Sequence, residues 1–137
     1  MDVIHRLLGL TCDDVRHDLE VDQWCFAFQE RVSLQVTSTW RIVAKGEIVL
    51  ARDDNGQKFG RSAPILAAIE ARPFLIGSRV SKFSVAPDTA DLRLDFESGA
   101  RLEVFNDSSG YEAWQFNAPE GLVMVAQGGG KLVKTTR

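Results

Sequence analysis

The sequence predicts an α+β domain, mainly antiparallel β, folded as a curved sheet or a partly open barrel. Apolar residues occupy alternate positions through most of the segment 24–50, as expected for strands with one buried face. Short connections separate the predicted strands, and these favour antiparallel pairing because parallel strands need long crossovers. Two stretches of the chain also resemble each other, which predicts two similar β-hairpin units joined by one helix.

The two similar stretches are residues 40–56, WRIVAKGEIVLARDDNG, and residues 94–110, LDFESGARLEVFNDSSG. Their alignment places Trp40, Ile42, Ile48, Leu50, Asp53 and Gly56 on Leu94, Phe96, Leu102, Val104, Asp107 and Gly110. Each copy predicts a strand, a tight turn, a second strand and an acidic turn closed by glycine. Hairpins require these shared residues, so the repeat predicts a scaffold and no chemistry. A site is expected where the copies differ, at residues 111–114.

One domain, residues 1–137, accounts for the length of the chain. Residues 1–20 are predicted to form a short amphipathic helix and a polar connector, and residues 21–56 the first β unit. A helix is predicted over 62–71, with Ser62 as its N-cap and Pro73 beyond its end. The second β unit spans 79–134, and the three glycines at 128–130 predict a flexible link within it.

The composition argues against several classes of function. The net charge is -3 with acidic and basic residues interspersed, so no basic stripe suggests a nucleic-acid partner. No apolar run reaches the ~18 residues of a membrane span, and the N-terminus lacks the pattern of a signal peptide. Cys12 and Cys25 are too few for a disulfide framework. We therefore expect a cytoplasmic protein; secretion without a cleaved signal is the open alternative.

The sequence contains no established motif for catalysis, a cofactor or a metal. It has no P-loop, GxGxxG or GxSxG pattern, and His5, His17, Cys12 and Cys25 lack the spacing of a metal site. A pair of Cys25 and His17 is the conceivable arrangement for nucleophilic chemistry. The acidic turn 53–56 resembles the start of a calcium loop but lacks the glutamate at the twelfth position. We expect no catalytic residue, no metal and no cofactor, which argues against an enzyme.

The segment Tyr111-Glu112-Ala113-Trp114 is the least ordinary local feature. If it is a strand, Glu112 shares an apolar face with Trp114 and Phe116. A carboxylate there must lie at a rim or pair with a cation, and Arg52 has the parity to be that cation. The candidate binding residues are therefore Glu112, Trp114, Tyr111, Arg52, Trp40 and Trp24. The alternatives are a structural ion pair and a core filled by the tryptophans.

Several short motifs together resemble a known family. They are Trp40-Arg41-Ile42, Gly46-Glu47-Ile48, the turn 53–56, Phe96-Glu97-Ser98-Gly99, Leu102-Glu103-Val104 and Tyr111-Glu112-Ala113-Trp114. In this order, over residues 24–130, the chain resembles a family of small bacterial domains of unknown function. The resemblance implies a small stand-alone domain, immunity-like or accessory to a toxin system. It brings no catalytic residues with it.

Three functional hypotheses follow. The leading one is a non-enzymatic module that binds a protein partner, whose basic surface would suit the acidic turns. The second is a β-barrel or cup for a small ligand, lined by Trp24, Trp40 and Trp114. The third is a small hydrolase or isomerase with Glu112 as general acid or base. The edges of an open sheet also make a homo-oligomer an expectation to test.

Overall fold

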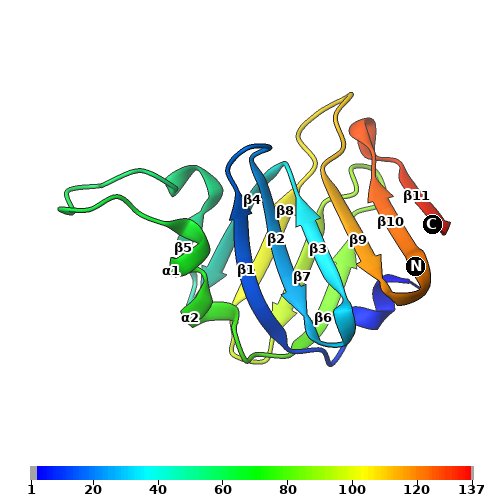
Figure 1. Ribbon diagram of the computed structural model, residues 1–137, viewed down its shortest axis with the longest axis horizontal. Coiled ribbons are helices and arrows are strands. Elements are labelled where there is room, and N and C mark those ends of the chain that lie inside the picture. The colour runs from blue at the N-terminus through cyan, green and yellow to red at the C-terminus, as the bar shows by residue number, and fades with distance from the viewer. Residues whose placement is uncertain (1–2, 137) are drawn as a thin grey trace.

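The computed structural model describes residues 3–136 and consists of two antiparallel sheets packed face to face (Figure 1). One sheet has the strand order β1-β2-β3-β9-β10-β11 and the other β5-β4-β8-β7-β6. The strands are β1 (Cys12–Asp18), β2 (Gln23–Phe28), β3 (Ser33–Val36), β4 (Thr39–Ala44), β5 (Glu47–Ala51), β6 (Val80–Val85), β7 (Leu92–Phe96), β8 (Arg101–Phe105), β9 (Trp114–Ala118), β10 (Leu122–Ala126) and β11 (Leu132–Thr136). The predicted α+β class with mainly antiparallel strands is confirmed. Within residues 3–136 the sheets do not close into a barrel.

Short helical segments connect the strands. Two single-turn helices, α1 (Ala67–Glu70) and α2 (Arg72–Leu75), lie between β5 and β6 and pack against β1. The 3₁₀ turns are η1 (Ile4–Leu7), η2 (Gln29–Arg31), η3 (Arg52–Asp54), η4 (Pro119–Gly121) and η5 (Gly128–Gly130). Between η3 and α1 the chain projects as a long arm, at the left of Figure 1. Backbone hydrogen bonds close the base of the arm, from Gly56 N–H to the Ile65 carbonyl and from Ile65 N–H to the Gln57 carbonyl, each 2.8 Å long.

The core lies between the two sheets and is built from the alternating apolar positions. On β2, Trp24 and Phe26 are buried, whereas Gln23 and Cys25 on the opposite face are only partly covered. The same alternation holds along β4, β7, β8 and β9. Burying a large apolar side chain stabilises a fold by about 1.5–3 kcal/mol relative to leaving it exposed. The period-two pattern is therefore the main source of this architecture.

The two similar stretches form neighbouring hairpins of the five-stranded sheet, in a register that the sequence alignment did not give. The order β5-β4-β8-β7 places the hairpins side by side in the same sense. Ile42 pairs with Leu50 in the first, and Leu94 pairs with Leu102 in the second. Ile42 thus takes the place of Leu94, although the alignment set it on Phe96. A slip of two residues keeps every side chain on its face, so the burial pattern hides the difference.

Two predicted elements were wrong. The connector within residues 1–20 contains β1, the edge strand that pairs with β2. An extra residue, Asp13, bulges from β1, and a bulge breaks the alternation that would have revealed the strand. The single helix over 62–71 is replaced by α1 and α2. Leu66 is extended, and Pro73 lies in the first turn of α2 instead of ending a helix, since a first turn needs no N–H from it.

Candidate functional site

One end of the sandwich brings together all six residues that the sequence analysis singled out. The register sets Trp24 opposite Val36 and Val36 opposite Trp114, while Thr39 pairs with Phe105. The turn 19–22, residues 37–38, η3 and the loop 106–113 therefore meet at the same end, the upper end in Figure 1. We call its exposed residues the acidic end: Asp22, Asp53, Asp107 and Glu112, with Leu19, Val21 and Tyr111 among them.

The three tryptophans form the floor of this end and belong to the core. Each is the first or second residue of its strand, and their exposed fractions are 1% for Trp24, 0% for Trp40 and 2% for Trp114. Trp24 and Trp40 meet edge to face with ring centroids 5.1 Å apart. The indole N–H of Trp114 donates to the Ala90 carbonyl over 2.8 Å. The tryptophans thus fill the space between the sheets, where the ligand-cup hypothesis expected a cavity.

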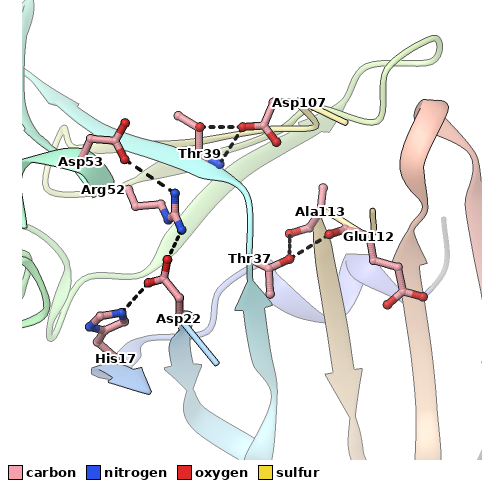
Figure 2. A network of polar contacts seen from close by, with 9 residues as sticks. All are labelled: His17, Asp22, Thr37, Thr39, Arg52, Asp53, Asp107, Glu112 and Ala113. Atoms are coloured by element: carbon pink, nitrogen blue, oxygen red, sulfur yellow. Dashed lines mark hydrogen bonds and ion pairs between the residues drawn. The ribbon is translucent and has the colours of Figure 1, made fainter. Parts of the chain in front are cut away.

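A chain of polar contacts fastens the turn 19–22 to η3 (Figure 2). His17 stacks on Trp24 with ring centroids 3.8 Å apart, and its Nε2 lies 2.8 Å from Asp22 Oδ1. The other carboxylate oxygen of Asp22 accepts a hydrogen bond from Arg52, whose guanidinium also lies 3.6 Å from Asp53. The hydrogen bond from His17, followed by the charge of Arg52, lowers the pKa of Asp22 below its ordinary value. Asp22 is therefore ionised in the folded protein at neutral pH.

The predicted pair of Glu112 and Arg52 is wrong. Arg52 pairs with Asp22 and Asp53, and the side chain of Glu112 points away from it (Figure 2). The reason is that β9 begins at Trp114, so Glu112 precedes the strand and is exposed. Its backbone carbonyl accepts a hydrogen bond from the hydroxyl of Thr37 over 2.8 Å. The main chain of Glu112 is thus anchored, while its carboxylate faces solvent.

An open hollow of about 730 Å³ lies between the loops of the acidic end. It is lined by Thr37, Ser38, Asp107, Ser108, Tyr111 and Glu112. Asp107 is fixed by the hydroxyl of Thr39, which donates to it over 2.7 Å (Figure 2). The Tyr111 ring beside the hollow is 82% exposed. The hollow therefore presents carboxylates and one projecting aromatic ring to solvent.

The three glycines at 128–130 hold this end together, so the predicted flexible link is wrong. The backbone of Gly128 packs so closely on Gly110 that a Cβ would lie 2.5 Å from it. A Cβ on Gly130 would lie 2.1 Å from the Asp88 carbonyl oxygen, and its φ is +106°. The N–H of Gly129 donates to the Ser108 carbonyl over 2.9 Å. Only glycine allows this approach of η5 to Gly110 in the loop 106–113 and to Asp88 in the turn between β6 and β7.

Sequence reasoning missed the turn 19–22 of the acidic end, which carries Asp22 and in which Leu19 and Val21 are 81% and 62% exposed. They lie in the turn between β1 and β2, where the predicted connector (ending at residue 20) meets the predicted first β unit (beginning at residue 21). A signal was present, because large aliphatic residues alternate with Asp18, Glu20 and Asp22 just before a strand. A tight turn has no structural need for exposed leucine and valine.

Groups typical of catalysis or metal binding are dispersed. His17 faces the core side of β1, whereas Cys25 lies on the outer face of the same sheet, 3.5 Å from Arg16, so these two do not form the conceived pair. Among residues 3–136 no three His, Cys, Asp or Glu side chains gather as metal ligands would. In the same part of the chain no helix has the length and apolar character needed to cross a membrane.

Residues 17–136 match the model of a family of unknown function, DUF6188. This match confirms the predicted resemblance to a domain of unknown function and extends it beyond the segment 24–130. No curated protein and no solved structure matches the chain.

Proposed function

The chain belongs to DUF6188, a family of unknown function, and we propose that it is a non-enzymatic module that binds a protein partner through the acidic end. The observation that carries the proposal is the group of Leu19, Val21 and Tyr111, all more than 60% exposed, among carboxylates at one end of the sandwich.

The chemistry of this end suits a basic partner surface. Tyrosine is enriched at the centres of protein interfaces because its ring buries a large area with little loss of side-chain entropy. Asp22 lies in the same turn as Leu19 and Val21, and Asp107 and Glu112 lie in the same loop as Tyr111. Complementary charge raises the rate of association and selects the partner. The scaffold under them is fixed by buried tryptophans and by the contacts of Asp22, so little ordering is needed on binding. The proposed binding surface is therefore acidic, with exposed apolar residues in two of its loops.

The form of this activity that agrees with the family resemblance is immunity-like. In that role the module covers a basic surface of a toxin in a bacterial cytoplasm. Its free thiols, Cys12 and Cys25, suit a reducing compartment. The acidic end is then the surface that meets the toxin.

The test begins with affinity capture from the source organism, after which the captured protein is purified and its dissociation constant measured. We expect Tyr111→Ala to weaken binding at least about tenfold, as for a central interface aromatic. Ile48→Ala is the matched control, because Ile48 is 58% exposed on β5, whose first residues lie toward the opposite end. Glu112→Lys should weaken binding further at low salt and less at high salt.

Two outcomes would overturn the proposal. One is a partner whose affinity depends on Ile48 and is unchanged by Tyr111→Ala and Glu112→Lys. The other is a partner with an acidic contact surface and no dependence of affinity on salt. Either result would place the binding surface away from the acidic end.

A small-ligand function has one observation in its favour, at the opposite end of the sandwich. There a second hollow, of about 550 Å³, is bounded by the two hairpin turns and α2 and is lined by Ala44, Lys45, Glu47, Val49, Pro73, Phe74, Ser98, Gly99 and Ala100. Its volume lies in the range of small-molecule sites. Phe74→Asp should abolish any rise in unfolding temperature that an apolar probe such as a short-chain alcohol produces. A rise that survives this change would exclude the hollow as the binding place.

A further inference from the structure

The arm between η3 and α1 ends in an aromatic residue whose backbone is in an unfavourable conformation. The N–H of Arg61 donates to the Lys58 carbonyl over 2.8 Å and closes a turn at the outer end of the arm. The two central residues of this turn, Phe59 and Gly60, have φ angles of +46° and +84°, as in a type I′ turn. Asparagine, aspartate or glycine is favoured at the first of these positions, and a bulky residue there is an outlier. Because Phe59 is 69% exposed, packing within the chain does not account for its presence.

The structure holds the arm away from the rest of its own chain. Two backbone hydrogen bonds close its base. The guanidinium of Arg61 donates to both carboxylate oxygens of Glu70 in α1, over 3.0 and 2.9 Å. In Figure 1 the arm extends outward at the left, whereas the loop 106–113 lies at the upper end of the sandwich. The arm therefore presents Phe59 to a surface outside its own chain, and strained residues of this kind are typical of functional sites.

The arm is also a basic segment of an acidic protein. Residues 56–66 include Lys58 and Arg61 and no acidic residue. Glu70 balances the charge of Arg61, whereas Lys58 is exposed and takes part in none of the ion pairs within residues 3–136. The outer end of the arm thus offers an exposed aromatic ring with a free ammonium group beside it. Its complement is a hollow that offers an exposed ring and a free carboxylate.

The hollow of the acidic end has this complementary character. Its lining includes Asp107 and Glu112 and no basic side chain. Asp107 is held by the hydroxyl of Thr39, whereas the carboxylate of Glu112 forms no ion pair with any other residue that the structure describes. Tyr111, which is 82% exposed, belongs to the same lining. The arm and the hollow thus each carry an exposed ring next to an unpaired charge, and the two charges are opposite.

We propose that the arm of one copy of this chain seats in the acidic hollow of a second copy, with Phe59 against Tyr111 and Lys58 paired with Glu112. Two aromatic rings attract each other edge to face or offset, and the ion pair sets the orientation of the arm. The arm starts at η3, whose Asp53 belongs to the acidic end, so it leaves from the end that carries the hollow. Two such contacts across a two-fold axis make a closed dimer, the commonest symmetry of soluble oligomers. The contact buries only the area of two short loops, so the dimer is expected to be weak.

Charge favours a second copy over an anionic membrane, the other surface suited to an aromatic ring beside a cation. The carboxylates of the acidic end lie near the base of the arm and would face the anionic headgroups. In the dimer the same carboxylates face the basic arm of the other copy. Self-association then occupies the same hollow as the proposed protein partner and competes with it. Because the dimer forms from the purified chain alone, its absence would leave the proposed function untouched.

Sedimentation of the purified chain tests whether the arm mediates self-association. Between about 1 µM and 1 mM the weight-average mass of the wild type should rise from one chain toward two. Phe59→Asn should stay monomeric over this range and keep or raise its unfolding temperature, because asparagine suits the turn. Ile69→Ser is the matched control, since Ile69 is 58% exposed on α1 outside the arm, and it should dimerise as the wild type does.

Two results of these measurements would overturn the proposal. One is a wild-type chain that stays monomeric over the whole range, or a Phe59→Asn chain that dimerises equally well. The other is a wild-type monomer that cosediments with phosphatidylglycerol vesicles and loses this binding on Phe59→Asn, which would assign the arm to a membrane.

An exchange of charges tests the pairing itself. Lys58→Glu and Glu112→Lys should each weaken the dimer at least about tenfold, because each sets like charges against each other. A chain that carries both changes should regain most of the wild-type affinity, since each new carboxylate meets the new ammonium group of the other copy. Lys45→Glu with Glu112→Lys is the matched control, because it has the same net charge but places its new carboxylate beside the second hollow, at the opposite end of the sandwich. Equal recovery by both double variants would show an effect of net charge alone and would overturn the proposal.

Discussion

The acidic end of the sandwich has two layers whose residues are close in sequence and opposite in environment. Val21 is 62% exposed and Trp24, three positions later, is 1% exposed. Tyr111 is 82% exposed, and Trp114 is 2% exposed. In both cases a turn presents the first residue to solvent and the strand that follows buries the second. The comparison indicates that stability depends on the first residues of the strands. Under the proposed function, recognition depends on the turns before them, so the two properties should separate on mutation.

The largest effect on stability is expected from the tryptophan layer. Trp40 is fully buried and meets both Trp24 and Phe26 edge to face. Trp40→Ala should lower the free energy of unfolding by about 3–5 kcal/mol because it leaves a cavity between the sheets. Chemical denaturation measures this change, and Trp40→Phe, which keeps an aromatic ring, is the control with a smaller loss. A loss below about 1 kcal/mol for the alanine variant would mean that the layer is loosely packed.

The contact between Gly130 of η5 and Asp88, in the turn between β6 and β7, should give the next largest effect. Gly130→Ala drives a methyl group into the Asp88 carbonyl at a positive φ, which should cost about 1–3 kcal/mol in the free energy of unfolding. Gly110→Ala is the control and should change the free energy of unfolding less, because a Cβ at Gly110 meets nothing within 4 Å. Thermal unfolding of both variants measures the difference. Equal unfolding temperatures would show that η5 can shift without loss.

The contacts of Asp22 should contribute less and in a pH-dependent way. Asp22→Asn should cost about 1 kcal/mol at pH 7, since the side chain is 58% exposed and its ion pair is partly screened. The pKa of Asp22 is lowered in the folded state, so its stabilising effect is complete above the unfolded value of about 3.9 and is lost as the pH falls through the folded value. The difference between wild type and variant should shrink as the pH falls below about 4. Glu20→Gln, which removes an exposed carboxylate from the same turn, is the control.

The sequence allowed the faces of the strands to be predicted but not their neighbours. Alternation placed Trp24, Trp40 and Trp114 on buried faces, and each follows a turn closely enough to lie near a strand end. The partner of each strand depends on contacts between distant segments, such as β3 with β9 and β4 with β8. Local patterns do not contain that information. A slip of two residues in the hairpin alignment was invisible for the same reason, because it preserves every face.

The errors at the site have a common physical origin. Arg52 had suitable parity to meet Glu112, but its partner is decided by which turns stack at the end of the sandwich, and the turn 19–22 lies nearest. The bulge at Asp13 concealed β1, and with it the turn that carries Leu19 and Val21. The glycine run looked flexible because sequence shows the freedom of glycine and not the neighbour that requires it. Prediction failed where contacts across the fold, rather than local pattern, decide the structure.

The smallest effect on stability is expected from the exposed residues of the turns. A change there tests whether stability and partner binding depend on different residues. Leu19→Ser should change the free energy of unfolding by no more than about 0.5 kcal/mol, because its side chain is 81% exposed and loses little buried area. The same change should weaken partner binding, since it removes apolar surface from the acidic end. Chemical denaturation and a binding titration of one preparation measure both quantities. If Leu19→Ser destabilises the chain as much as Asp22→Asn, the turn supports the fold rather than recognition, and the separation of the two layers fails. If stability and binding are both unchanged, Leu19 does not contact the partner, and other residues of the acidic end, Tyr111 among them, must account for binding.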